Sequence, residues 1–597
     1  MRRAVPPGGR RRAGRDHRGR ARVDDRRVVL AEAHARLARG HGQLRLSGRE
    51  RRSGGRHIGR GPVAASVGCC HRPLTASGTT PGPLAIPHVR PAPEEVTRVT
   101  ANPLAPSWLL PPDDANALDP RVWSRGTTRD DDGALRIAGV SAPELAARFG
   151  TPLYVVDEAD VRGRAAETRA AFEREAAAVG TTARVYYAGK AFLSVEVARW
   201  MVEEGLHIDV CSGGELAVAL AAGADPARLG FHGNNKSVAE IDRAVGAGIG
   251  QIVVDSAIEV ERIAAAAAAH GRVQPVRLRV NSGVHAHTHE YLATAREDQK
   301  FGITLADAPG LVARIRSHAS LSFTGLHAHI GSQIFETDAF VESARRLLDL
   351  HERLLADGPV PELNLGGGFG IAYTSVDRPV PVPEIARRLA RIVGDECGRR
   401  GIAVPVIAVE PGRSVVGPST ATLYTVGTVK DVLVTVGGVD GEVAEAESAT
   451  GDVEDPRVAE EAETAIRRYV SVDGGMSDNA RPALYGADYS VRIASRTSDA
   501  DPALVRVAGK HCESGDLVVL ADYLPGDVRP DDLVAVPATG AYCWALASNY
   551  NWIGRPPVVA VRDGEARVIV RGETEADLLA RDLGTPLAAS PDVNGAR

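Results

Sequence analysis

The stretch 184-RVYYAGKAFLSVEVARWMVEEGLHIDVCS-212 holds one complete repeat of the pattern that decides the fold. It begins with an apolar, aromatic run and ends with a second apolar run. Between them, SVEVARWMVEEG places apolar residues at the i, i+3 and i+4 spacing of a helix. The stretch therefore predicts a strand, a helix and a second strand, which together form one βαβ unit.

The same alternation continues along the chain, and eight apolar runs follow one another with helical stretches between them. They are RVYYAGKA at 184, HIDVCS at 207, LGFHGN at 229, QIVVDS at 251, VRLRVN at 276, FTGLHAHIG at 323, PELNLGGG at 361 and PVIAVEPGR at 405. Eight strand–helix units in about 230 residues is the number and length typical of an α/β protein with a (β/α)8 TIM-like barrel. A doubly wound sheet is the structural alternative, and it would concentrate function at one switch point.

Nearly every predicted strand ends in a polar or glycine motif. These motifs are Lys190, Ser212–Glu215, His232–Asn234, Asp255, Asn281, His329, Gly366–Gly368 and Glu410. Because barrel active sites lie at the C-terminal ends of the strands, we expect these residues to converge on one mouth.

Five further segments follow from the composition. We expect a disordered or mis-annotated extension at 1–95, an N-terminal segment at 96–158 that packs with a β domain, and the barrel at 159–418. A valine-rich, all-β C-terminal domain follows at 419–585, with an acidic inserted loop at 439–466, and 586–597 form a disordered tail. The run LYVVD at 153–157 precedes the barrel and could lead into it from the β domain.

The net charge of -5 is divided unevenly along the chain. Residues 1–95 contain 21 arginines against seven acidic residues, so the remainder is strongly acidic. This argues against nucleic acid or an anionic membrane as a partner of the main body. For residues 1–95, our preferred hypothesis is that they are upstream sequence translated from a misplaced start, with the true start at Val96 or Val99. A basic nucleic-acid-binding tail and a transit peptide are the open alternatives.

The six cysteines are scattered without metal-ligand spacing, and no run reaches the 18 apolar residues of a membrane span. Few cysteines in a long chain are typical of a reduced, cytoplasmic protein. His285, His287 and His289 alternate as metal ligands on one strand face would. We nevertheless expect no metal there.

Only five of the 71 basic Lys and Arg residues are lysines, so Lys190 stands out. A desolvated lysine can attack a carbonyl, which arginine cannot. The glycines at 366–370 and Glu410-Pro411-Gly412-Arg413 follow the last two strands, where barrels commonly bind phosphate. With a carboxylate at Glu410, this combination indicates pyridoxal phosphate. Taken singly, the glycines could form a tight turn, Glu410 could form a structural salt bridge, and His329 could be a core histidine.

The motifs together resemble the fold-type III, pyridoxal-phosphate-dependent amino-acid decarboxylases, most closely those that act on diaminopimelate. The matching segments are YYAGKAF, DVCSGGEL, HGNNKS, DQKFGI, GLHAHIGSQ, NLGGGFG, EPGR, DGGMSDNARPALYGA, CESGD and TGAYC, across about residues 105–555. The implied reaction converts meso-2,6-diaminopimelate to L-lysine and carbon dioxide, the last step of lysine biosynthesis.

The resemblance also implies residue roles. Lys190 would carry the cofactor as a Schiff base, and Cys512 would donate a proton. The expected cofactor contacts are Lys190, Asp209, His329, Ser332, Gly366, Gly367, Gly368, Glu410, Gly412, Arg413 and Tyr542. The expected substrate contacts are Arg413, Arg481, Tyr485, Glu513 and Tyr542. In this family the CESGD segment reaches the other subunit's site, so the resemblance implies a homodimer.

Substrate specificity depends on fewer residues. Diaminopimelate carries a distal ammonium and a distal carboxylate, which Glu513 and Arg481 could bind. An ornithine- or arginine-type decarboxylase of the same fold and a catalytically inactive regulatory homologue are the alternatives. An alanine racemase is less consistent with Glu410, because it would place an arginine at the pyridine nitrogen.

Overall fold

The computed structural model describes residues 102–284, 300–436 and 463–584, all within the compact unit Glu95–Arg597. The predictions for residues 1–95, for the tail at 586–597 and for His285, His287 and His289 lie outside the described residues.

Eight parallel strands form a closed barrel, which confirms the predicted fold and excludes the doubly wound sheet. They are β5 (Ala183–Ala188), β6 (His207–Val210), β7 (Leu229–Phe231), β8 (Gln251–Val254), β9 (Gln274–Asn281), β11 (Leu321–His327), β12 (Glu362–Asn364) and β13 (Val406–Val409). Closure is made by β13, which pairs with β5 in the register Ile407↔Ala183, while β8 and β9 pair from Ile252↔Val276 onward. A two-residue strand, β10 (Ile303–Thr304), pairs with the end of β9.

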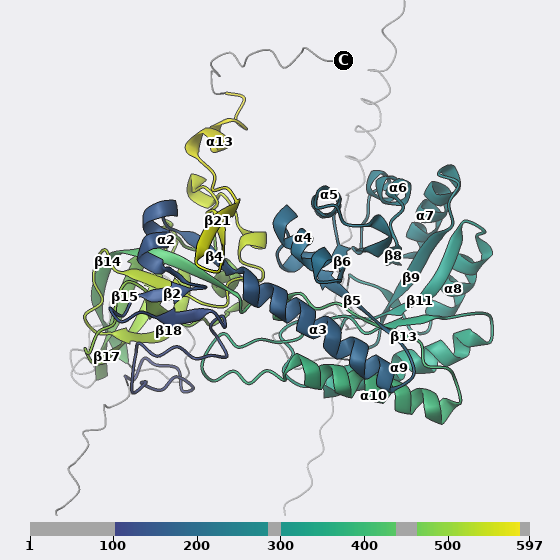
Figure 1. Cartoon of the computed structure of the whole chain (residues 1–597), viewed down its shortest axis with the longest axis horizontal. Coiled ribbons are helices and arrows are strands. Elements are labelled where there is room, and N and C mark those ends of the chain that lie inside the picture. The colour runs from purple at the N-terminus through teal and green to yellow at the C-terminus, as the bar shows by residue number, and fades with distance from the viewer. Residues whose placement is uncertain (1–101, 285–299, 437–462, 585–597) are drawn as a thin grey trace, which may run out of the picture. The chain divides into compact units, whose positions relative to one another are not determined.

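Helices surround the barrel strands, as Figure 1 shows. They are α3 (Glu158–Ala178), α4 (Val195–Glu203), α5 (Gly213–Ala221), α6 (Val238–Ala247), α7 (Ala257–Ala269), α8 (Ala308–Ser317), α9 (Asp338–Leu355), α10 (Val382–Arg400) and the short α11 (Arg413–Val416). Three of them begin at serine caps: Ser194, Ser212 and Ser237 each accept a hydrogen bond from a backbone N–H of the first turn. These caps lie directly after the polar strand ends, so they fix the chain where the site residues leave the barrel.

A second sheet contains the C-terminal strands. It comprises β14 (Thr420–Val436), β15 (Glu463–Val472), β16 (Arg492–Ile493), β17 (Pro502–Ala508), β18 (Leu517–Pro525), β19 (Leu533–Val536), β20 (Val558–Arg562) and β21 (Glu565–Val570). The early strand β4 (Leu153–Asp157) lies between β14 and β20 in this sheet. The chain thus passes through the β domain, crosses into the barrel along α3, and returns.

The N-terminal segment adds a small sheet and one helix. Its elements are β1 (Thr127–Arg129), β2 (Leu135–Ile137), β3 (Val140–Ser141) and α2 (Ala142–Phe149). Buried residues of this segment, among them Trp123 and Leu135, share a hydrophobic cluster with Leu423 and Val559 of the β domain. Two short helices, α12 (Arg481–Tyr485) and α13 (Glu575–Leu579), complete the C-terminal part.

The predicted acidic loop at 439–466 was drawn too long. Residues up to 462 lie outside the described part of the chain, but residues 463–466 begin β15 and pair with β14 in the register Thr435↔Thr464 and Leu433↔Ile466. The polar, alanine-rich composition indicated a loop, whereas pairing with a neighbouring strand determines the actual conformation.

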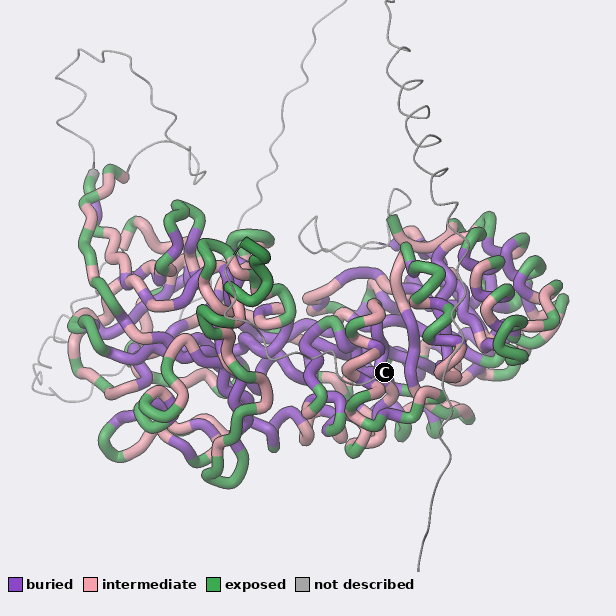
Figure 2. The backbone as a smooth tube through the Cα atoms, turned by 90° about the horizontal axis from the view of Figure 1, so that it is seen from above, coloured by how far each residue is buried: buried purple, intermediate pink, exposed green. Residues whose placement is uncertain are grey.

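The strands of the barrel and of the second sheet are largely buried, and Figure 2 shows buried segments in purple with exposed segments in green mainly around them. Their apolar side chains belong to one large hydrophobic cluster. Within the described ranges, no helix combines the length and the apolar composition needed to cross a membrane.

Candidate active site

A cavity of about 300 Å³ opens at the C-terminal ends of the barrel strands. Of the residues expected at the site, the cavity is lined by Lys190, Asp209, His329, Ser332, Gly368, Glu410, Gly412, Arg413, Arg481, Tyr485 and Tyr542. Arg481, Tyr485 and Tyr542 come from beyond the barrel, so the C-terminal domain forms part of the wall. The structure therefore brings most of the predicted residues into one space.

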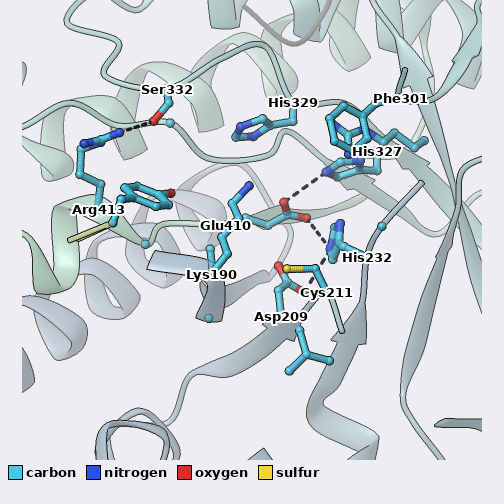
Figure 3. Close-up of a pocket in the computed structure, with 18 of the residues that line it drawn as sticks. Lys190, Asp209, Cys211, His232, Phe301, His327, His329, Ser332, Glu410 and Arg413 are labelled. Carbon is cyan, nitrogen blue, oxygen red and sulfur yellow. Dashed lines mark hydrogen bonds and ion pairs between the residues drawn. The ribbon is translucent and has the colours of Figure 1, made fainter. Parts of the chain in front are cut away.

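The cavity has two chemically different ends, which Figure 3 shows. Ser332 and Arg413 lie at one end, and His327, His232 and Asp209 lie at the other. Glu410 lies beside these two histidines, and Lys190 and His329 point into the space between the two ends. Lys190 lies on the turn Gly189–Ala191 directly after β5, where its side chain is accessible to solvent. The arrangement places one amine between a cationic end and an end rich in carboxylate and imidazole.

Glu410 is the centre of the second end. One carboxylate oxygen accepts a hydrogen bond of 2.7 Å from Asn364 Nδ2 and lies 3.4 Å from His232 Nε2. The other oxygen lies 3.2 Å from His327 Nε2. Burial lowers the pKa of His327 to about 3 and that of His232 to about 4, so both imidazoles are neutral near pH 7.

The charge state of Glu410 follows from these neighbours. Burial alone would raise the pKa of Glu410, but the two imidazoles and the charge of Arg277 outweigh burial and hold this pKa well below its usual range. The ionised form is also the form that accepts hydrogen bonds from neutral N–H donors. A permanent negative charge therefore lies at this end of the cavity.

Asp209 behaves differently although it lies nearby. Burial and the negative charge of Glu410 raise the pKa of Asp209 well above its ordinary value. Neither of its oxygens has a hydrogen-bond partner among the described residues, and Oδ1 lies 3.2 Å from His232 Nε2. A Cβ atom at Gly230 would lie 2.3 Å from Asp209 Oδ1, so glycine is required there to leave room for the carboxyl. The pKa values of two neighbouring carboxyls are thus shifted in opposite directions, a pattern common in active sites.

A buried ion pair lies in the barrel interior. Arg277 of β9 is completely buried and pairs with Glu362 of β12, which also binds Arg184 Nη1 at 2.7 Å. The Arg277 guanidinium faces the ring of Tyr186 at 5.3 Å. The charge of Arg277 adds to the effect of His327 and His232 in lowering the pKa of Glu410.

The glycine motif allows close approach of backbones. A Cβ at Gly367 would lie 1.9 Å from the carbonyl oxygen of Glu410, and one at Gly368 would lie 2.2 Å from that of Gly331. Gly368 lines the cavity, but Gly366 and Gly367 lie behind His329, and the Gly367 N–H donates to His329 Nδ1 at 3.2 Å. Gly368 thus forms part of the cavity wall, whereas the cofactor contacts expected of Gly366 and Gly367 stay predictions.

Two predicted residues lie apart from the cavity of their own chain. Cys512 and Glu513 are exposed and do not line it. The Cys512 backbone N–H donates to Asn551 Oδ1 at 3.3 Å, which fixes the segment at the surface.

Several cavity residues were not predicted. Those with charged, reactive or bulky side chains are His327, Arg279, Phe301, Cys211 and Leu546. Strand periodicity could have found two of them, because His327 and Arg279 precede His329 and Asn281 by two positions and so face the same side. Burial and Glu215 raise the pKa of Cys211 to about 12, so its thiol stays protonated.

The residues present fit the expected cofactor, pyridoxal phosphate. An accessible lysine lies between an ionised carboxylate, suited to a protonated ring nitrogen, and a cationic end suited to phosphate. At the cationic end, Arg413 Nη2 donates to Ser332 Oγ at 2.8 Å, while its buried Nε has no hydrogen-bond partner among the described residues. A donor of this kind is available to an anion.

Two family descriptions match the chain. Residues 165–417 match the pyridoxal binding domain of the pyridoxal-dependent decarboxylases, and residues 412–540 match their C-terminal sheet domain. The two matches overlap at residues 412–417, which contain α11 and lie between the last barrel strand and β14 of the second sheet.

Individual relatives agree with these matches. The chain is 51% identical over 474 residues to diaminopimelate decarboxylase of Mycobacterium bovis, covering 78% of this chain and 98% of the relative. It is 42% identical over 467 residues to diaminopimelate decarboxylase of Bacillus subtilis, covering 77% and 98%.

Solved structures are also similar. That of diaminopimelate decarboxylase from M. jannaschi has a TM-score of 0.67 at 29% identity, covering 78% of this chain and 99% of that one. That of the Helicobacter pylori enzyme in complex with L-lysine has a TM-score of 0.62 at 26% identity, covering 73% and 98%.

Proposed function

The chain belongs to the diaminopimelate decarboxylase family of pyridoxal-dependent decarboxylases, and we propose that it is a carboxy-lyase that converts meso-2,6-diaminopimelate to L-lysine and carbon dioxide. This reaction is the last step of lysine biosynthesis. The observation that carries the proposal is the composition of the cavity wall, where one lysine, an ionised Glu410 and the guanidiniums of Arg413 and Arg481 face a common space.

Pyridoxal phosphate, when bound, supplies the electron sink for the pair of electrons left by the departing carbon dioxide. Lys190 would hold it covalently, and His329 would lie against its ring. Glu410 would bind the ring nitrogen and keep it protonated, since its own negative charge is maintained by the barrel interior. Ser332, Gly368 and Gly412 would hold the phosphate end, and Arg413 would contact both the phosphate and the substrate.

The distal half of the substrate needs partners of both signs. Arg481 and Tyr485 are suited to the distal carboxylate, because a guanidinium binds a carboxylate through two parallel hydrogen bonds. The carboxylates on the described cavity wall, Asp209 and Glu410, lie at the ring-nitrogen end. The described residues of one chain therefore provide no carboxylate for the distal ammonium on this wall.

We propose that a second copy of the chain supplies it. Glu513 would bind the distal ammonium and Cys512 would donate a proton to the α carbon, both across a homodimer interface with shared active sites. Their exposure on the chain to which they belong supports this assignment. A buried cysteine in the same segment could not reach another subunit.

Carbon dioxide release tests the reaction. The purified protein is supplied in parallel with meso-diaminopimelate, lysine, ornithine and arginine, and we expect release from the first alone. Equal or faster release from ornithine or arginine would favour the alternative decarboxylases. A protein that binds the cofactor but releases nothing would be the inactive regulatory homologue.

Mixing two inactive variants tests the shared sites. Lys190→Ala and Glu513→Ala should each abolish turnover of diaminopimelate. Refolded or co-expressed together, they should regain up to about a quarter of wild-type activity, since one of the two sites in each mixed dimer has both residues intact. Recovery of no activity in a mixture shown to contain mixed dimers would contradict the shared site.

We also propose a cytoplasmic location. The four described cysteines, Cys211, Cys397, Cys512 and Cys543, are all free thiols, which is typical of a reducing compartment. Cell fractionation with antibody detection tests this directly, and recovery in a secreted fraction would contradict it.

A further inference from the structure

Two buried guanidiniums lie close together on the cavity wall although they come from different domains. Arg413 begins α11 after the last barrel strand, and Arg481 begins α12 in the β domain. Both side chains are buried and both line the cavity. Within the described ranges, neither forms an ion pair with a carboxylate, and their hydrogen bonds go to hydroxyl groups instead. Two neighbouring guanidiniums that keep their positive charges need a neutral side chain to fix their positions.

Tyr373 contacts both of them. Its hydroxyl accepts a hydrogen bond from Arg413 Nη1, and the Arg481 guanidinium lies 4.4 Å from the centre of its ring. Arg481 in turn donates to the hydroxyl of Tyr489, whose ring meets that of Tyr373 edge-on at 5.0 Å. A tyrosine between two arginines stabilises each cation through its hydroxyl or its ring face without removing the charge.

The backbone of Tyr373 is itself fixed. Its N–H donates to Asp377 Oδ2 at 2.9 Å, and its carbonyl accepts from Ser490 N at 3.2 Å and Ser490 Oγ at 3.0 Å. Tyr373 follows β12 in the barrel, while Ser490 adjoins Tyr489 in the β domain. These bonds hold the loop after β12 against the β-domain segment at Ser490, so the side chain of Tyr373 is fixed beside both guanidiniums.

We propose that Tyr373 is a positioning residue that sets the separation and orientation of Arg413 and Arg481, and thereby the affinity of the site for a ligand with a distal carboxylate. The proposal rests on the proposed function for the identity of that ligand. A carboxylate in place of the phenol would neutralise the guanidiniums and compete with the substrate, whereas tyrosine leaves both charges available to it.

Tyr373→Phe tests the hydroxyl alone. Removing one hydrogen bond to a charged group should raise KM for meso-diaminopimelate about tenfold and leave kcat within about twofold. Tyr373→Leu removes the ring as well and should raise KM about a hundredfold. Tyr523→Phe is the matched control, because this buried tyrosine packs in a separate cluster with Leu109 and Leu504. It should leave both parameters unchanged.

Calorimetry on the holoenzyme provides a readout that does not depend on turnover. The probes are pimelate, which has two carboxylates and no amine, and 1,5-diaminopentane, which has two amines and no carboxylate. Tyr373→Phe should weaken pimelate binding about tenfold and leave diaminopentane binding unchanged. The visible cofactor band should keep its intensity in this variant. If the leucine variant fails to fold, the phenylalanine variant still decides the question.

Two results would overturn the proposal: an unchanged KM and pimelate affinity in Tyr373→Phe, or an equal loss of affinity for pimelate and diaminopentane. The second result would mean general damage to the cavity. Failure of the wild-type protein to release carbon dioxide from diaminopimelate would instead refute the proposed function. The calorimetric comparison would then still test Tyr373.

Discussion

Replacement of Glu362 by glutamine should destabilise the protein strongly, because it leaves a buried guanidinium without its counter-charge. Arg277 is completely buried, and Glu362 is 2% exposed. The Nε and Nη1 atoms of Arg277 already lack hydrogen-bond partners among the described residues, so Glu362 is the group that compensates for its burial.

The magnitude follows from the difference between the two arginines that Glu362 binds. Removing one member of a buried ion pair costs about 3–5 kcal/mol, because the remaining charge stays desolvated. The Arg184 side chain is 47% exposed, so water solvates it when Glu362 is lost, and its part of the cost is below about 1 kcal/mol. Nearly the whole effect should therefore come from Arg277.

Urea unfolding followed by tryptophan fluorescence measures this effect. The slopes of the wild-type and variant transitions are compared first, because free energies from two-state fits can be compared only where the slopes agree. Arg277→Met combined with Glu362→Leu should unfold within about 1 kcal/mol of wild type, since an apolar pair of similar volume replaces the ion pair. Glu144→Gln, which breaks the exposed pair with Arg148, is the control and should cost less than about 0.5 kcal/mol. A loss below about 1 kcal/mol for the single variant, or a double variant no more stable than the single one, would refute the reasoning.

Three further predictions concern the site and the pH dependence of stability. Lys190→Ala should lose the visible cofactor band while circular dichroism stays unchanged, and a surviving band would exclude this lysine as the attachment point. Gly230→Ala should weaken cofactor binding about tenfold or more in a fluorescence titration, because the new Cβ would lie 2.3 Å from Asp209 Oδ1 and push this carboxyl out of place. An unchanged affinity would contradict a role for Asp209. Burial lowers the pKa of His351 to about 4, so the unfolded chain binds a proton below pH 6.5 that the folded chain does not. Stability should therefore fall on acidification from pH 6.5 towards 4. Between pH 7 and 5, the free energy of unfolding of His351→Leu, measured in urea at each pH, should fall by about 2 kcal/mol less than that of wild type. Equal losses would show that His351 is not buried in its neutral form.

The barrel was predictable because its signal is local. Each strand is an apolar run, and each helix repeats apolar residues at three and four positions, so the eight units could be counted directly from the sequence. Placing Lys190, His329 and Glu410 at one mouth needed only the rule that parallel barrel strands end at the same face. The boundary of β15 was missed because Glu463–Ile466 adopt a strand by pairing with β14, and their own composition does not encode this.

The finer structure of the site was not predictable in the same way. His327 and Arg279 could have been found from the two-residue period of a strand. Tyr373 could not, since its role depends on a loop after β12 meeting Tyr489 more than a hundred positions later. The outward position of Cys512 likewise depends on how the segment is held by Asn551.

By itself, the sequence determined which residues form the strands and which chemical groups stand at their ends. Side-chain periodicity and residue type are properties of neighbouring positions, and they carry this information without any long-range contact. The tertiary structure alone decided that the pKa of Glu410 is lowered while that of Asp209 is raised, and that Arg413 and Arg481 line one cavity without a carboxylate partner among the described residues. Desolvation and the interactions between charges depend on distances between segments that only folding brings together.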